Sequence, residues 1–353
     1  MKPMTVGRPS GVPARLGSVT RIADLGSPPF QVERIPTEDW AFADYVLARV
    51  RHVPHGFAGG FELPSGRGVT PMTGDLLVGA LSRRFATLEA TGSFEAVGED
   101  GVMHLLTDAG CFGALTSRSL FSPALLEVEY EGHLVTEAGK RSNMRDWARP
   151  HSGTPFDMPV VLIVGTSMSA GKTHAGRLAV RALKELGHTV VGAKLTGAGR
   201  RRDVLAFEDA GADAVCDFMD AGLPTTVCPP AEYRVAVDAL LSNVGPDDAT
   251  VAVVEAGASP LEPYNGATLV ELLGERVVYT VLCASDPYAV EGIRVAWDRD
   301  FDLVAGPAAN TAAGIQLVRK LTGLHALDLT DEASMPELQR WMSDACGAGP
   351  GAR

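Results

Sequence analysis

The stretch Pro159-Val-Val-Leu-Ile-Val-Gly165-Thr-Ser-Met-Ser-Ala-Gly-Lys-Thr173 decides the fold. Its first six residues are an unbroken apolar run, which is typical of a parallel strand buried on both faces. From Thr173 to Leu186 apolar residues recur at helical spacing, and Gly187 follows where a left-handed C-cap belongs. A buried strand, a loop of small residues and a helix, in this order, predict a loop that binds phosphate groups.

The same alternation continues toward the C-terminus. Further apolar runs predict parallel strands at 189–194, 225–227, 250–255, 277–282, 303–305 and 326–329. Between them, helical patterns span 203–210, 231–241 and 261–273. Strands separated by helical stretches build βαβ units, so we expect an α/β fold: a P-loop parallel sheet with helices on both faces.

The residues before this region have a different pattern. Short apolar or alternating runs at 74–81, 102–106 and 126–135 predict strands, with helical content near 38–51. We therefore expect a smaller β-rich domain, with a barrel as one arrangement, to precede the P-loop domain. The expected boundaries are a flexible N-terminus (1–18), the β-rich domain (19–148), a linker rich in Pro, Gly and Ser (149–158), the P-loop domain (159–343) and a flexible tail (344–353).

Composition excludes several classes of protein. A chain of 353 residues is long enough for two domains that each bury a core. Its net charge of −12 repels phosphate backbones and anionic lipids, so we expect neither nucleic acid nor a membrane as a partner. The five cysteines form no close pair, which favours a reducing, cytoplasmic location.

The loop itself predicts nucleotide chemistry. Backbone N–H groups of such a loop surround a phosphate, Lys172 supplies a cation for the β and γ phosphates, and the Thr173 hydroxyl can ligate magnesium. We therefore expect ATP and Mg²⁺ as cofactors. The predicted cofactor-binding residues of the loop are Gly165, Thr166, Ser167, Ser169, Ala170, Gly171, Lys172 and Thr173.

Three segments resemble a known family. The loop is similar to the Gly-Thr-Asp-x-x-x-Gly-Lys-Thr loop of dethiobiotin synthetases and of relatives such as the molybdopterin-guanine dinucleotide accessory proteins, although Ser167 stands where the family has Asp. The segment 192–197 resembles the Lys-Pro-Val-x-x-Gly stretch of the family, which implies that Lys194 faces the γ-phosphate. Glu255-Ala-Gly-Ala-Ser is similar to its Glu-Gly-Ala-Gly-Gly stretch.

Further residues are candidates for the same site. An acidic residue directly after a buried strand is a usual magnesium ligand, so we expect Glu255 to share the metal with Thr173 and to act with Lys172 and Lys194 in catalysis. Asp203 is a further candidate metal ligand. The segment 306–311 resembles the late loop near which relatives hold the base, which implies a cofactor contact at Asn310.

Three functions remain open at this stage. The order of the domains, with Asp217-Phe-Met-Asp-Ala-Gly-Leu-Pro, resembles a bacterial family of unknown function, whose wider group is similar to D-glutamate N-acetyltransferases. The first hypothesis is an ATP- and Mg²⁺-dependent ligase or kinase that activates a carboxylate or similar oxygen. The others are an N-acyltransferase that uses acyl-coenzyme A and a nucleotide-switched accessory protein. Because Lys194 and the basic residues 200–202 would converge at the sheet edge, we expect a small anionic metabolite as substrate. We also expect a homo-oligomer, a dimer or higher.

Overall fold

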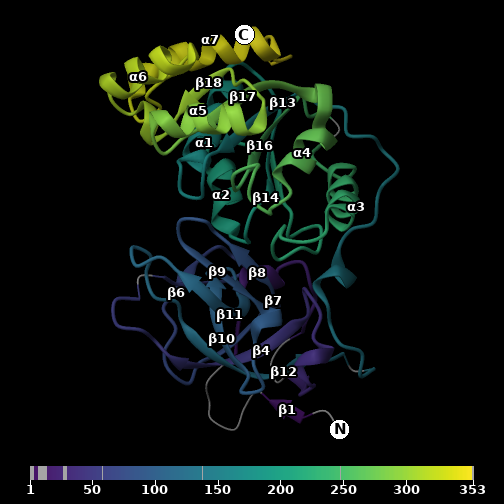
Figure 1. Cartoon of the computed structure of the whole chain (residues 1–353). Helices are drawn as coiled ribbons and strands as arrows, with labels where there is room; N and C mark the ends of the chain where they lie inside the picture. Colours follow the sequence, from purple (N-terminus) through teal and green to yellow (C-terminus); the bar gives the residue numbers. More distant parts are fainter. Residues whose placement is uncertain are drawn as a thin grey trace. The chain divides into compact units, whose positions relative to one another are not determined.

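The chain forms two compact units, shown in Figure 1. The computed structural model describes residues 4–6, 14–26, 30–57, 59–136, 138–246 and 248–351. The first unit holds Met1–Arg149 together with two short segments from later in the chain, Ala198–Arg201 and Phe218–Val227. The second unit holds Pro150–Gly197, Arg202–Asp217 and Cys228–Arg353. The chain therefore leaves the second unit twice, after the strands that end at Thr196 and Asp217.

The first unit is built mainly on antiparallel strand pairs, with two parallel pairs among them, and five of its strands close on themselves. Strand β12 pairs with β4, β4 with β7, β7 with β11, and β10 joins β11 back to β12, so that the ladders form a small barrel. Closure leaves these five strands without a free edge. The strands are β1 (Met4–Val6), β2 (Arg15–Leu16), β3 (Phe30–Glu33), β4 (Tyr45–His52), β5 (Phe61–Glu62), β6 (Gly68–Val69), β7 (Leu76–Leu81), β8 (Arg83–Phe85), β9 (Ala90–Ser93), β10 (Val102–Thr107), β11 (Cys111–Arg118) and β12 (Glu127–Leu134). Four 3₁₀ turns accompany them: η1 (Ser18–Thr20), η2 (Thr37–Asp39), η3 (Phe94–Ala96) and η4 (Met144–Trp147).

The prediction of helical content near residues 38–51 is wrong. Only the 3₁₀ turn η2 is helical there, and Tyr45–His52 is strand β4. Strand β4 lies between β12 and β7 and its first four residues are all buried. A strand covered on both sides carries a continuous apolar run instead of an alternating one, which removes the pattern that distinguishes a strand from a buried helix.

A buried polar network links β4 to β12. The Asp44 carboxylate is 3% exposed, and it accepts hydrogen bonds from the Asn143 amide (2.8 Å) and the Ala41 N–H (3.0 Å). The His133 imidazole lies 3.2 Å from the same carboxylate and 2.6 Å from the Tyr130 hydroxyl. Burial alone would raise the pKa of Asp44, but the His133 and Asn143 contacts outweigh burial and hold it below its ordinary value.

Replacing this carboxylate should weaken the first unit. We predict that Asp44→Asn destabilises it by about 1–3 kcal/mol at pH 7, because an amide has one acceptor oxygen where the native group uses two. A lowered folded pKa stabilises the fold above the unfolded pKa of about 4, and this contribution disappears as the pH falls through the folded value. Stability of Asp44→Asn should therefore decline less steeply between about pH 5 and pH 3.

Urea unfolding at several pH values measures both effects. The control is Asp39→Asn, since Asp39 is exposed on η2. Equal stability of Asp44→Asn and the wild type at pH 7 would show that the network is dispensable.

The second unit is a six-stranded parallel sheet between layers of helices. The strands lie in the order β15-β14-β16-β13-β17-β18, so the first of them in sequence, β13, is internal. They are β13 (Val160–Gly165), β14 (Val190–Thr196), β15 (Ala214–Asp217), β16 (Val251–Ala256), β17 (Val277–Cys283) and β18 (Leu303–Ala305). The helices are α1 (Lys172–Glu185), α2 (Arg201–Asp209), α3 (Pro230–Leu241), α4 (Gly266–Leu273), α5 (Pro287–Trp297), α6 (Ala312–Thr322) and α7 (Met335–Cys346), with 3₁₀ turns η5 (Gly274–Arg276), η6 (Pro307–Ala309) and η7 (Glu332–Ser334).

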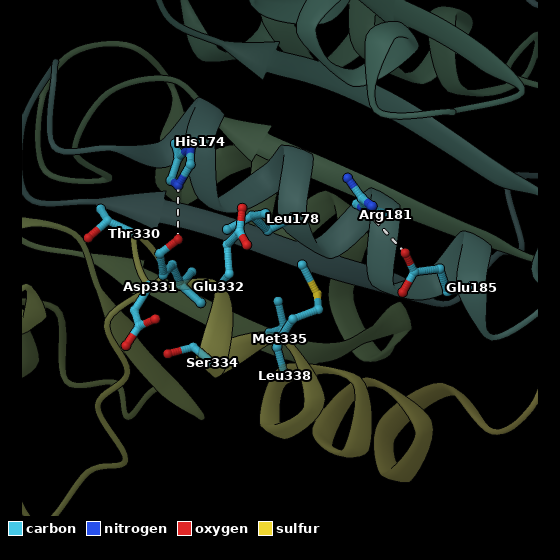
Figure 2. A pocket seen from close by; sticks show the side chains of 11 residues that line it. His174, Leu178, Arg181, Glu185, Thr330, Asp331, Glu332, Ser334, Met335 and Leu338 are labelled. Carbon is cyan, nitrogen blue, oxygen red and sulfur yellow. Dashed lines mark hydrogen bonds and ion pairs between the residues drawn. The ribbon is translucent and has the colours of Figure 1, made fainter.

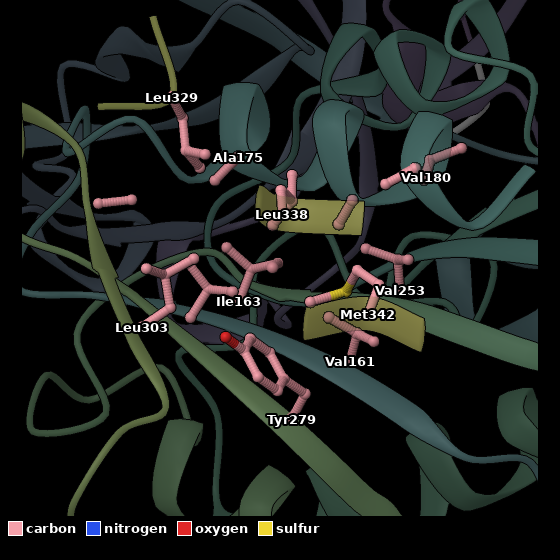
Figure 3. Close-up of a cluster of buried hydrophobic side chains, with 14 of the residues drawn as sticks. Val161, Ile163, Ala175, Val180, Val253, Tyr279, Leu303, Leu329, Leu338 and Met342 are labelled. Atoms are coloured by element: carbon pink, nitrogen blue, oxygen red, sulfur yellow. The ribbon is translucent and has the colours of Figure 1, made fainter. Parts of the chain in front are cut away.

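The main core of this unit lies between the sheet and the helices α1 and α7. Figure 3 shows Val161 and Ile163 of β13 packed with Val180 of α1 and with Leu338 and Met342 of α7. The α/β fold expected from the sequence is confirmed, since helices connect the strands of a parallel sheet. The core holds α1 in place, and with it the end of the loop that precedes it.

Some expected elements differ in position. Residues 225–227 form no ladder, and Thr225 makes a single antiparallel bridge with Ala198. The strand that precedes these residues is β15, at Ala214–Asp217. The sequence analysis did not identify it, because four residues show no clear period.

The flexibility expected of the two chain ends stays a prediction, although parts of both ends are packed. Ser18 is fully buried, while residues 1–3, 7–13, 352 and 353 of the expected flexible ends lie outside the described residues. Helix α7 continues to Cys346, and Gly349 and Gly351 donate to the carbonyls of Leu186 and Gly187. The expected linker, residues 149–158, contains neither helix nor strand.

Candidate functional site

The loop 165–173 connects the end of β13 to the start of α1, as the sequence predicts. Gly171 has φ +94° and precedes the first helical residue, and Ser169 also adopts a left-handed backbone, with φ +61°. The loop is held to the end of β17, since Thr166 N donates to the Cys283 carbonyl (3.0 Å) and Ser285 N donates to the Thr166 hydroxyl (3.2 Å). The N-terminus of a 14-residue helix thus points its unpaired N–H groups at the carboxyl edge of the sheet, where anions bind.

Lys172 lies inside the loop. Its side chain is nearly buried, and its Nζ donates to the Ser167 carbonyl at 2.6 Å. A Cβ on Gly165 would come within 2.9 Å of both Cδ and Nζ of Lys172, so only glycine allows this lysine to lie across the strand end. Burial lowers the pKa of Lys172, and the nearby Glu255 carboxylate partly opposes that shift. A bound anion would further oppose the lowering of the Lys172 pKa. The site therefore stabilises negative charge.

Thr173 and Glu255 meet across the start of α1 and the end of β16. The Thr173 hydroxyl donates to the Glu255 carboxylate at 2.9 Å, and Glu255 is 2% exposed. Burial raises the pKa of Glu255, and the neighbouring Lys194 and Lys172 cations limit the rise. A hydroxyl and a carboxylate are ligands that suit Mg²⁺. No group of three or more His, Cys, Asp and Glu side chains gathers among the described residues, so Mg²⁺ held here would take its other ligands from phosphate and water.

Lys194 extends the site along the sheet edge. In the parallel register it lies beside Glu255 of β16 on one side and beside Asp217 of β15 on the other. Its Nζ forms a hydrogen-bonded ion pair with the Asp203 carboxylate of α2. The structure therefore brings five predicted site residues into one cluster: Lys172, Thr173, Glu255, Lys194 and Asp203. Lys172, Lys194 and Glu255 are buried, Thr173 and Asp203 are half-buried, and Asp203 contacts Lys194.

The late loop approaches the phosphate loop at Gly306. A Cβ on Gly306 would lie 2.4 Å from the Ala170 carbonyl, and Gly306 has φ +80°. Asn310 is exposed, after η6, and a role in holding the base stays a prediction. Sequence reasoning selected the segment 306–311 but named only Asn310 as a site residue, although a glycine directly after an apolar strand and before Pro307 is a recognisable signal for a tight turn.

Gly306 offers a test of this loop contact. We predict that Gly306→Ala costs roughly 2–4 kcal/mol of stability and weakens anion binding at the loop, because the new methyl group meets the Ala170 carbonyl in a strained backbone. Gly323→Ala is the matched control: Gly323 has φ +73° but nothing within 4 Å of an added Cβ. The measurements are thermal unfolding and pyrophosphate binding; the same loss in both variants would assign the effect to backbone strain alone.

Comparison with known proteins identifies distant similarities of fold. No family model and no curated protein sequence matches the chain. The hydrogenase maturation factor HypB of Archaeoglobus fulgidus is 15% identical, over 53% of this chain and 89% of that one, with a TM-score of 0.36. The signal recognition particle receptor FtsY of Elizabethkingia anophelis is 16% identical, over 59% and 75%, with a TM-score of 0.34. A ParA family ATPase of Chlorobium tepidum TLS is 12% identical, over 54% and 92%, with a TM-score of 0.30.

The resemblances to dethiobiotin synthetases and to the bacterial family of unknown function stay predictions. Within the part of the chain that the structure describes, the helices are all too short or too polar to cross a lipid bilayer.

Proposed function

We propose that the second unit binds MgATP at residues 165–173 and that the chain is an enzyme that transfers the γ-phosphoryl group to a carboxylate or similar oxygen of a small anionic metabolite. The observation that carries the proposal is the 2.9 Å contact between Thr173 and the buried Glu255 carboxylate at the N-terminus of α1. A carboxylate next to bound phosphates is repulsive unless a divalent cation lies between them. This favours a magnesium nucleotide over acyl-coenzyme A, whose phosphates need only a cradle of donors.

The residues have distinct roles in this proposal. Lys172 would neutralise charge on the β and γ phosphates, and Thr173 and Glu255 would hold Mg²⁺, which would supply positive charge beside the transferred group. Lys194 lies beside Glu255 and stabilises the same group from the neighbouring strand. Asp203 keeps the Lys194 ammonium in place. Among the described residues, the fully buried Thr196 hydroxyl has no hydrogen-bond partner, which makes it a candidate contact for the acceptor substrate.

A direct test is calorimetric titration with ATP, GTP and acetyl-coenzyme A, each with and without Mg²⁺. We expect Mg²⁺-dependent binding of ATP, and we expect Lys172→Ala to weaken it by about 100-fold or more, because a buried charge-assisted contact to phosphate is lost. Lys320→Ala, at an exposed position of α6, should bind like the wild type. If acetyl-coenzyme A binds and ATP does not, the proposal is rejected in favour of the acyltransferase alternative.

The metal role of Glu255 can be tested separately. We predict that Glu255→Gln still binds ATP but loses the gain in affinity from Mg²⁺, and that any ATP turnover falls by about 100-fold or more. Glu271→Gln removes a carboxylate that forms an exposed ion pair with Arg234 on the α3–α4 surface and serves as the control. An unchanged dependence on Mg²⁺ in Glu255→Gln would remove Glu255 from the metal site.

A further inference from the structure

A pocket of about 390 Å³ lies along one side of α1, between this helix and the segment that leads into α7. Figure 2 shows His174, Thr330 and Asp331 at one end, the Arg181–Glu185 pair at the other, and Leu178 and Met335 between them. The volume is within the range of pockets that hold small molecules, roughly 300–1,000 Å³. No site residue discussed above lines it.

The pocket begins beside the phosphate loop. His174 directly follows Thr173 on the first turn of α1, and its Nε2 donates to the Leu329 carbonyl at 3.0 Å. The segment containing Leu329 also reaches the same sheet edge: Ala326 pairs in parallel with Val304 of β18, and Leu327 N donates to the Val304 carbonyl. The strand expected at 326–329 is reduced to this single bridge, and because the chain continues past it in the same direction, residues 328–331 lie at the carboxyl edge, as the phosphate loop does.

The middle of the pocket is apolar and well supported. Leu329 and Leu338 belong to the buried core of the unit, and Leu178 and Met335 pack against that core. At the far end the Glu185 carboxylate accepts from Arg181 (3.0 Å) and from the Gln339 amide of α7. The pocket is therefore preformed, with polar groups at both ends, one of them next to Thr173.

The polar end next to Thr173 presents groups suited to a nucleoside. A carbonyl oxygen only accepts, so Nε2 of His174 carries a proton, and Nδ1 is an acceptor whenever it carries none. The Asp331 carboxylate accepts the Ala333 N–H at 3.0 Å and has further acceptor positions. Ribose hydroxyls and exocyclic amino groups are donors that match these acceptors, while a flat base matches the apolar middle of the pocket.

We infer that this pocket receives the nucleoside end of the nucleotide whose phosphates bind at 165–173. The inference rests on the proposed function and adds to it the site that distinguishes a nucleotide from a bare polyphosphate. Leu178 and Met335 enclose the base, and His174 and Asp331 bind the ribose side.

The test fills the pocket and compares ATP with inorganic tripolyphosphate, both with Mg²⁺, by calorimetry on the full chain. Leu178→Trp should lower the affinity for ATP by about tenfold or more and leave the affinity for tripolyphosphate within about twofold, because only ATP carries a base. Val295→Trp, the same kind of change at an exposed position of α5, should alter neither affinity.

A second variant covers the case in which Leu178→Trp disturbs α1 and weakens both ligands. Met335→Trp fills the pocket from the α7 side, and we expect it to weaken ATP selectively. Unchanged ATP affinity in a folded Met335→Trp variant, as judged by circular dichroism and thermal unfolding, would overturn the inference.

The two proposals fail in distinguishable ways. If the pocket variants bind ATP like the wild type while Lys172→Ala does not, the base lies elsewhere and the phosphate site stands. If Lys172→Ala binds both ATP and tripolyphosphate like the wild type, the proposed function itself is wrong.

Discussion

Burial of charge at one edge of the parallel sheet is the constraint on which the rest of the second unit depends. Lys172, Lys194 and Glu255 are each at most 5% exposed. Burial lowers the pKa of Lys172 and raises the pKa of Glu255, which favours the neutral form of each. Charged groups survive in such a place only when they are paired and hydrogen-bonded. The Thr173 hydroxyl, the Ser167 carbonyl and the Asp203 carboxylate supply these partners.

The fold explains why these groups meet. Parallel register aligns Lys194 with Glu255, and β13, next to β16, delivers the loop that carries Lys172 and Thr173. The core beneath α1 and α7 fixes the helix whose N-terminus faces the same edge. An open parallel sheet thus concentrates chemistry where its strands end, and the glycines at 165 and 306 allow the backbone and the lysine to approach closely.

The first unit shows a limit of sequence reasoning. Its barrel closes through β10, which pairs with strands on both sides. Strand β4 pairs with two neighbours, and its first four residues are all buried. Apolar runs in such strands carry no period that separates them from helices, so residues 38–51 were assigned wrongly. The short segments 198–201 and 218–227 were assigned to the P-loop domain, yet they lie in the first unit. Long-range pairing, such as the bridge between Ala198 and Thr225, leaves no local signal.

The sequence by itself determined the α/β class of the second unit and the position of its phosphate loop, because a buried strand, small residues, Gly171-Lys172-Thr173 and a capped helix are all local features. It also selected Lys194 and Glu255 as strand-end charges. Only the tertiary structure decided that Asp203 contacts Lys194, that Gly306 lies against Ala170, and that a pocket forms beside His174. These relations join residues that are far apart in the chain or in different elements, and packing alone fixes them.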